Sequence, residues 1–169
     1  LDALNVPVSA RVRQIVANLE RWRWMPDTLG RRHVLVNVPD YAVVVREDGE
    51  PVLRLRAIVG RAYRQTPAFS GRMTYLVFAP YWHVPPGIAA SDKLPLLRED
   101  PSYLAAQRMT LLDVPTNRPV DPATVDWAAL SGPEFNARYR LRQDPGPLNA
   151  LGRVKFMFTN PYNVYLHDT

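Results

Sequence analysis

The chain has 169 residues, 47% of them hydrophobic and 22% charged, which suits one globular domain with a buried core. Its 17 prolines against eight glycines predict many short elements and argue against a helical bundle. The absence of cysteine excludes disulfides, thiolate metal sites and a cysteine nucleophile within these residues, and the net charge of +5 comes without a dense basic block, which disfavours a nucleic-acid-binding domain.

An amphipathic helix is predicted near the start of the chain. Ser9 is a candidate start signal, and Pro26 with Gly30 ends the pattern. We expect this helix to dock onto the following sheet, because Trp22 and Trp24 lie at its end. The apolar residues at helical spacing are Val8, Val12, Ile15, Val16, Leu19 and Trp22.

A β-rich stretch follows, with strands predicted at residues 33–38, 41–45, 52–59 and 73–78. Pro39-Asp40 is a turn signal, and Asp48-Gly49 predicts a tight hairpin. Apolar residues and arginine alternate along residues 52–59, so we expect one buried and one solvent-facing side there. Pro80 ends the last of these strands.

Residues 81–138 lose the strand periodicity. Short helices are predicted at residues 89–97, 101–107 and 122–130, with Asp121 as N-cap and Pro122 as first residue of the last. We interpret the segment as a helical insertion in a β domain, too rich in proline to form a core alone and therefore leaning on the sheet.

Strands are again predicted at residues 138–143, 154–158 and 163–167. The arginines at 138, 140 and 142 alternate and are expected on one sheet face. That face is either solvated or a site for substrate carboxylates, which arginine binds in a bidentate manner.

His167 is the best candidate for a general base, because it ends a strand that would hold its ring at a cleft. His33 and His83 are interpreted as structural. No short-spaced ligand pair predicts a metal, no glycine-rich loop predicts a phosphate cofactor, and the scattered carboxylates are interpreted as solvated. No apolar run approaches the roughly 20 residues needed to span a bilayer.

Several phrases, taken together and in order, resemble the large Gram-negative L,D-transpeptidases over essentially the whole chain. They are NLERWRWMP at 18–26, VNVPDY at 36–41, VGR at 59–61, QTP at 65–67, FS at 69–70, PYWHVPP at 80–86, RQDPGPLNALG at 142–152, KFMF at 155–158 and VYLHDT at 164–169.

The resemblance implies a mainly β domain with α (α+β): a YkuD-like β-sandwich catalytic domain with an N-terminal linking helix and an inserted helical capping subdomain. Residues 1–30 would link it to a preceding peptidoglycan-binding domain. Residues 31–169 would be a partial catalytic domain, with residues 81–138 as the cap. The chain lacks an initiator Met and is expected to begin inside a longer protein.

The activity implied is peptidoglycan L,D-transpeptidation in the periplasm or cell envelope, forming 3→3 cross-links between diaminopimelate-containing stem peptides through a cysteine acyl-enzyme that carbapenems also form. His167 matches the family's base. The family's Gly-Cys motif is expected roughly 20 residues downstream, so this stretch alone should be inactive. The resemblance implies no cofactor, metal or nucleic acid.

Tyr75, Tyr81 and Trp82 match positions near the cleft, and we add Arg140 and Arg142 as candidate substrate-binding residues. The alternative function is a non-catalytic peptidoglycan-binding module that uses the cleft and basic surface. A gene that continues into a Gly-Cys motif would favour the enzyme over the module.

Overall fold

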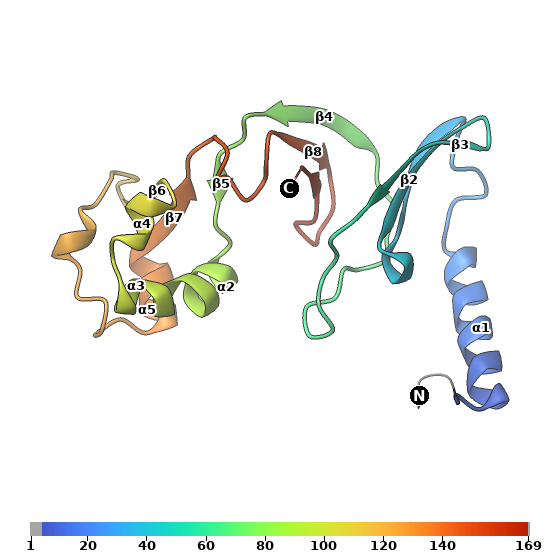
Figure 1. Cartoon of the computed structure of the whole chain (residues 1–169), viewed down its shortest axis with the longest axis horizontal. Helices are drawn as coiled ribbons and strands as arrows, with labels where there is room; N and C mark the ends of the chain where they lie inside the picture. Colours follow the sequence, from blue (N-terminus) through green and yellow to red (C-terminus); the bar gives the residue numbers. More distant parts are fainter. Residues whose placement is uncertain (1–4, 169) are drawn as a thin grey trace. The chain divides into compact units, whose positions relative to one another are not determined.

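A computed structural model describes residues 5–168 and divides the chain into two compact units, Leu1–Ser70 and Gly71–Thr169. Both units contain helices and antiparallel strands, which confirms the predicted α+β class (Figure 1). Among the described residues, none of the helices is long and apolar enough to cross a bilayer.

The first unit begins with helix α1 (Val8–Arg23), as its periodicity predicted. Pro7 is the N-cap and no side chain caps the helix, so the start signal assigned to Ser9 was wrong. The docking prediction was also wrong, because no residue of α1 is buried and Trp22 is 59% exposed. An apolar stripe indicates that one face of a helix favours burial. It does not indicate which element covers that face.

Three antiparallel strands complete this unit in the order β1-β2-β3: β1 (Arg32–Asn37), β2 (Ala42–Glu47) and β3 (Glu50–Arg56). The 3-10 turn η2 (Val38–Asp40) joins the first two strands. Asp48 and Gly49 both have positive φ (51° and 86°), which confirms the predicted tight hairpin.

The edge strand β3 differs from its prediction. β3 stops at Arg56, and every one of its residues is exposed, so the expected buried face is absent from it. The alternation shows only which side chains share a face. Burial also requires a covering layer, and among the described strands of this sheet it is the central β2 that buries Ala42 and Val44.

The second unit holds two further antiparallel sheets. One has the order β4-β8-β9, made of β4 (Met73–Phe78), β8 (Val154–Phe158) and β9 (Leu166–His167). The other has the order β5-β7-β6, made of β5 (Trp82–His83), β7 (Tyr139–Gln143) and β6 (Met109–Asp113). β6 was not predicted, because five residues between proline-rich turns carry a weak periodic signal.

Helical pieces pack beside the β5-β7-β6 sheet (Figure 1). The chain winds through α2 (Pro86–Ile88), the π-helical turn η3 (Ala89–Lys93) and α3 (Leu94–Glu99), and later through α4 (Tyr103–Ala106). Asp121 caps η4 (Pro122–Thr124) as predicted, but the helix expected to Leu130 ends at Thr124. A further helix, α5, spans Gly132–Arg138, and Ser131 is its N-cap in a capping box with Glu134.

The main hydrophobic core is shared between this helical segment and the β5-β7-β6 sheet, so the segment packs against a sheet as predicted. Phe135 and Leu97 are fully buried there, and Leu111 and Leu141 come from the adjoining strands. Proline breaks helices into short pieces but does not prevent several pieces from packing round one centre. Arg138 ends α5, so only Arg140 and Arg142 alternate on β7.

Candidate functional site

His167 lies on β9, held by antiparallel pairing with β8, where Lys155 is its direct partner. Its side chain is exposed, and ring atom Nδ1 is 2.7 Å from the carbonyl oxygen of Asp168. A carbonyl oxygen can only accept, so Nδ1 donates and Nε2 keeps the free lone pair. The backbone thus selects the tautomer in which the outer nitrogen is the base.

The strand register puts several candidate side chains on the same face of this sheet. Tyr75 pairs with Met157, and Lys155 pairs with His167, two positions along β8. Because alternate residues of a strand share a face, Tyr75, Lys155 and His167 project from the same side. Two of the predicted site residues, Tyr75 and His167, therefore share one sheet face, and Lys155 shares it with them.

Tyr165 completes this group of side chains. The Nζ atom of Lys155 is 3.6 Å from the centre of the Tyr165 ring, and the rings of Tyr165 and His167 are 6.0 Å apart between centroids. Burial lowers the pKa of Lys155 and raises the pKa of Tyr165. Both side chains are half-buried, and this partial burial is the cause of both shifts.

The second group lies on the β5-β7-β6 sheet. His83 pairs with Arg142, so the two side chains project from the same face of the sheet. Arg140 lies two residues before Arg142 on β7. The Cζ atom of Arg142 lies 4.7 Å from the centre of the Tyr81 ring, and its Nη2 is 3.7 Å from a carboxylate oxygen of Asp144. The Arg142 Nε is shielded from solvent and donates to no described residue.

His83 reports on the charge of its surroundings. Its pKa is lowered first by burial and then by the positive charges of Arg142, Arg140 and Lys155. Lys155, on the other sheet of this unit, is the smallest of these causes. Sequence reasoning treated His83 as structural and gave Lys155 no role.

Two of the predicted substrate-binding residues, Trp82 and Arg140, contact other parts of the chain. Trp82 is buried in the main core, 9% exposed, and Lys93 lies 5.8 Å from its ring centre. Arg140 is exposed and donates from Nη2 to the carbonyl oxygen of Val114 at 3.2 Å. Their assignment to substrate binding stays a prediction.

Buried amides fix the loop between β7 and β8. Gln143, 1% exposed, donates to the carbonyl oxygens of Gln107 (3.0 Å) and Leu148 (2.7 Å) and accepts from the Ala150 N–H (3.0 Å). Asn149 donates to the carbonyl oxygen of Pro80 at 2.9 Å. These bonds tie the start of β5 to the loop that leads into Lys155, a role that the sequence alone did not indicate.

Gly152 packs directly against the end of β9. Its φ is +62°, and a Cβ atom added there would lie 2.6 Å from the carbonyl oxygen of Asp168, the same atom that accepts from His167. Asp168 is further held by Arg153, whose Nε is 3.2 Å from its carboxylate. The position of the His167 ring therefore depends on a glycine in the preceding loop.

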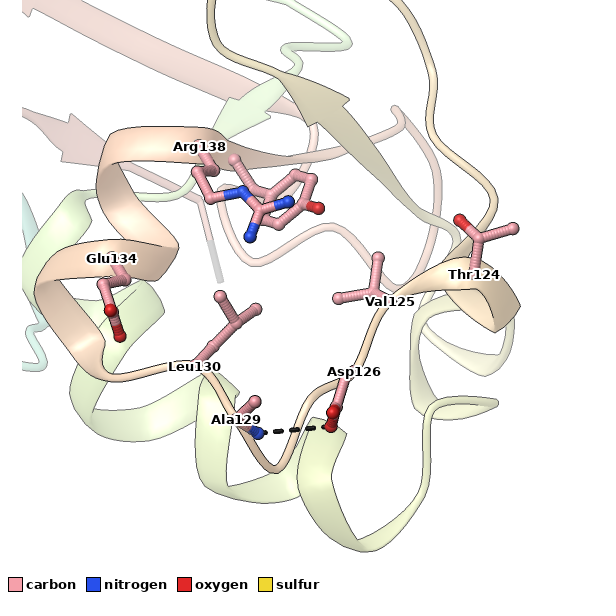
Figure 2. A pocket seen from close by; sticks show the side chains of 8 residues that line it. Thr124, Val125, Asp126, Ala129, Leu130, Glu134 and Arg138 are labelled. Atoms are coloured by element: carbon pink, nitrogen blue, oxygen red, sulfur yellow. Dashed lines mark hydrogen bonds between the residues drawn. The ribbon is translucent and has the colours of Figure 1, made fainter.

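A pocket lies elsewhere, between the loop after η4 and α5 (Figure 2). None of the predicted site residues lines it. Asp126 accepts from the Ala129 N–H at 3.2 Å, and Glu134 belongs to the capping box of α5. These acidic side chains serve the local backbone. The residues that line the pocket are Thr124, Val125, Asp126, Ala129, Leu130, Glu134, Arg138 and Tyr139.

The α+β fold and the histidine at a strand end can now be compared with known proteins. Residues 31–169 match the model of the YkuD family, the L,D-transpeptidase catalytic domain. The chain therefore belongs to this family, as the resemblance implied.

One relative is a Haemophilus influenzae protein that bears the provisional name L,D-transpeptidase. It is 34% identical over 157 residues, which cover 93% of this chain and 31% of that protein. The chain thus spans about a third of the length of the curated relative it matches.

Proposed function

We propose that the chain is part of a peptidoglycan L,D-transpeptidase of the periplasm or cell envelope, which forms 3→3 cross-links between stem peptides. The observation that carries the proposal is the placement of His167: its Nδ1 donates to a backbone carbonyl, and its exposed ring offers Nε2 as a base. Membership of the YkuD family supplies the class of reaction.

In the proposed reaction His167 takes the proton of a cysteine thiol supplied from downstream of Thr169, because the chain itself contains no cysteine. The thiolate attacks the carbonyl carbon of the peptide bond that follows diaminopimelate. The carbon–nitrogen bond breaks, the terminal residue leaves as an amine with the proton returned by His167, and a thioester remains.

The side-chain amine of diaminopimelate in a second stem then attacks the thioester. His167 accepts the proton of that amine, the new amide forms, and the cysteine leaves as thiolate. Tyr75 shares the face of His167, and Tyr81, Arg140 and Arg142 lie on or beside the second sheet. We propose that these residues contact the stem peptides.

The same proposal covers the domain organisation. Residues 1–30 would link a preceding peptidoglycan-binding domain to the catalytic domain, which the family model matches from residue 31. Residues 81–138 would be its capping subdomain. The buried contacts of that segment support its folding as a compact element.

Acylation by a carbapenem tests the proposal. The full-length protein, produced from its complete gene, is mixed with the antibiotic and examined by mass spectrometry. We expect one covalent adduct, and its rate of formation should fall at least about a hundredfold in His167→Gln, because an unassisted thiol is a poor nucleophile.

His33→Gln is the matched control. His33 is half-buried on β1, and its Nδ1 lies 3.2 Å from the carbonyl oxygen of Gly30, so its backbone contact is similar but it lies in the first unit. It should be acylated at the wild-type rate. A folded full-length protein that forms no adduct, or whose gene encodes no Gly-Cys motif after Thr169, would overturn the proposal.

A further inference from the structure

Helix α1 carries an apolar stripe along its whole length, and this stripe is open to solvent. No residue of α1 is buried, and each side chain of the stripe is at least 52% exposed. At about 3.6 residues per turn these side chains lie on one face of the helix. A continuous apolar face of this kind favours burial against another apolar surface. The stripe consists of Val8, Val12, Ile15, Val16, Leu19 and Trp22.

The remaining surface of α1 is basic. Arg11 and Arg13 lie beside opposite borders of the stripe, because each residue turns the helix by about 100°. Arg21 and Arg23 lie in the last turn. Glu20 is the acidic residue of the helix, and its carboxylate is 3.5 Å from Nη1 of Arg23. The helix therefore combines an apolar stripe with an excess of positive charge.

This charge distinguishes between two surfaces that an apolar helix face can bind. A second copy of α1 would bring two positively charged helices together, and like charges oppose association. An anionic lipid surface attracts the arginines, whose long side chains reach the headgroups while the stripe enters the boundary of the acyl chains. Trp22, at the end of the stripe, has the amphipathic ring that is enriched at this depth.

From these observations we propose that α1 binds the surface of an anionic phospholipid membrane, with its stripe in the interface and its arginines at the headgroups. The helix lies in the plane of the membrane, since its 16 residues are too few and too polar to span a bilayer. The inference goes beyond the proposed function, because α1 precedes the residues that the family model matches.

Vesicle binding by the 169-residue chain tests the proposal. The chain contains no cysteine, so Ile15→Cys can carry a single environment-sensitive fluorophore. Vesicles of phosphatidylglycerol and phosphatidylcholine in equal parts should shift its emission to the blue. We expect an affinity at least about tenfold higher than for vesicles of phosphatidylcholine alone, because several arginines are attracted to the anionic headgroups. Added salt should reduce this preference.

Ile58→Cys, labelled in the same way, is the matched control. Ile58 is an aliphatic residue of the same unit, 85% exposed and outside α1, so its fluorophore should stay in water. The arginines have a control as well. The double variant Arg13→Gln/Arg21→Gln should bind the anionic vesicles at least about tenfold more weakly. Arg118→Gln, which alters an exposed arginine of the second unit, should bind them as the wild type does.

No emission shift with anionic vesicles, equal affinity for the two kinds of vesicle, or an equal shift at Ile58 would overturn the inference. A shift at Ile15 that grows with protein concentration in the absence of lipid would also overturn it, because a second copy would then cover the stripe. Substitutions in α1 remove no core contact, since no residue of this helix is buried. Carbapenem acylation tests the proposed function separately from either result.

Discussion

Lys155 and His167 are direct partners across the β8–β9 ladder, and the ring of Tyr165 lies against both side chains. The cation and the proposed base are thus fixed to one sheet face by backbone hydrogen bonds.

Stability should depend on pH through His83. Its pKa is lowered in the folded chain by burial and by Arg142, Arg140 and Lys155, whereas Asp144 interacts with Arg142. The unfolded chain therefore binds more protons as the pH falls below about 6.5. We expect the free energy of unfolding to decrease from that pH downwards.

Urea unfolding between pH 7.5 and 5 measures this effect. His83→Gln should lessen the loss at acidic pH, since glutamine has no titrating proton, whereas His33→Gln should not. Equal pH profiles for the wild type and His83→Gln would contradict the assigned cause.

Replacing Gln143 with leucine should destabilise the second unit by about 3 kcal/mol, because hydrogen bonds to Gln107, Leu148 and Ala150 are lost with little change in size. Urea denaturation followed by circular dichroism measures the change. Glu99→Leu, an exposed substitution at the end of α3, is the control and should shift stability by less than about 0.5 kcal/mol. Similar losses in both variants would refute the buried network.

Phe135→Ala should cost about 3–5 kcal/mol, because Phe135 is fully buried between the rings of Trp127 and Tyr139. Phe78→Ala removes the same phenyl ring, but Phe78 is 71% exposed. This control should therefore lower the free energy of unfolding by less than about 1 kcal/mol. Thermal and urea unfolding distinguish the two. A small effect at Phe135 would show that the helical segment does not hold the main core.

Gly152→Ala should destabilise the chain by about 1–3 kcal/mol, because φ is +62° and the new methyl group would press on the carbonyl of Asp168. That carbonyl orients His167, so carbapenem acylation of the full-length protein should slow as well.

Gly87→Ala is the control, since an added Cβ there meets nothing within 4 Å. It should keep the wild-type acylation rate. If Gly152→Ala is acylated as fast as Gly87→Ala, the orienting role of the Asp168 carbonyl is wrong.

Local features of the chain could be predicted because local chemistry determines them. The spacing of apolar residues predicted α1, and Asp48-Gly49 predicted a hairpin that requires two residues with positive φ. The ordered set of short phrases along the whole chain predicted the family, which the match over residues 31–169 confirms. The capping box at Ser131 was available in the sequence but was overlooked, so α5 was missed.

Tertiary structure decided which faces are covered and which side chains meet. Nothing in the spacing of Lys155 and His167 indicates that strand pairing makes them direct partners. The exposed stripe of α1 was mispredicted for the same reason. Periodicity acts over neighbouring residues, whereas burial and charge proximity depend on contacts between segments far apart in the chain, which only the folded arrangement provides.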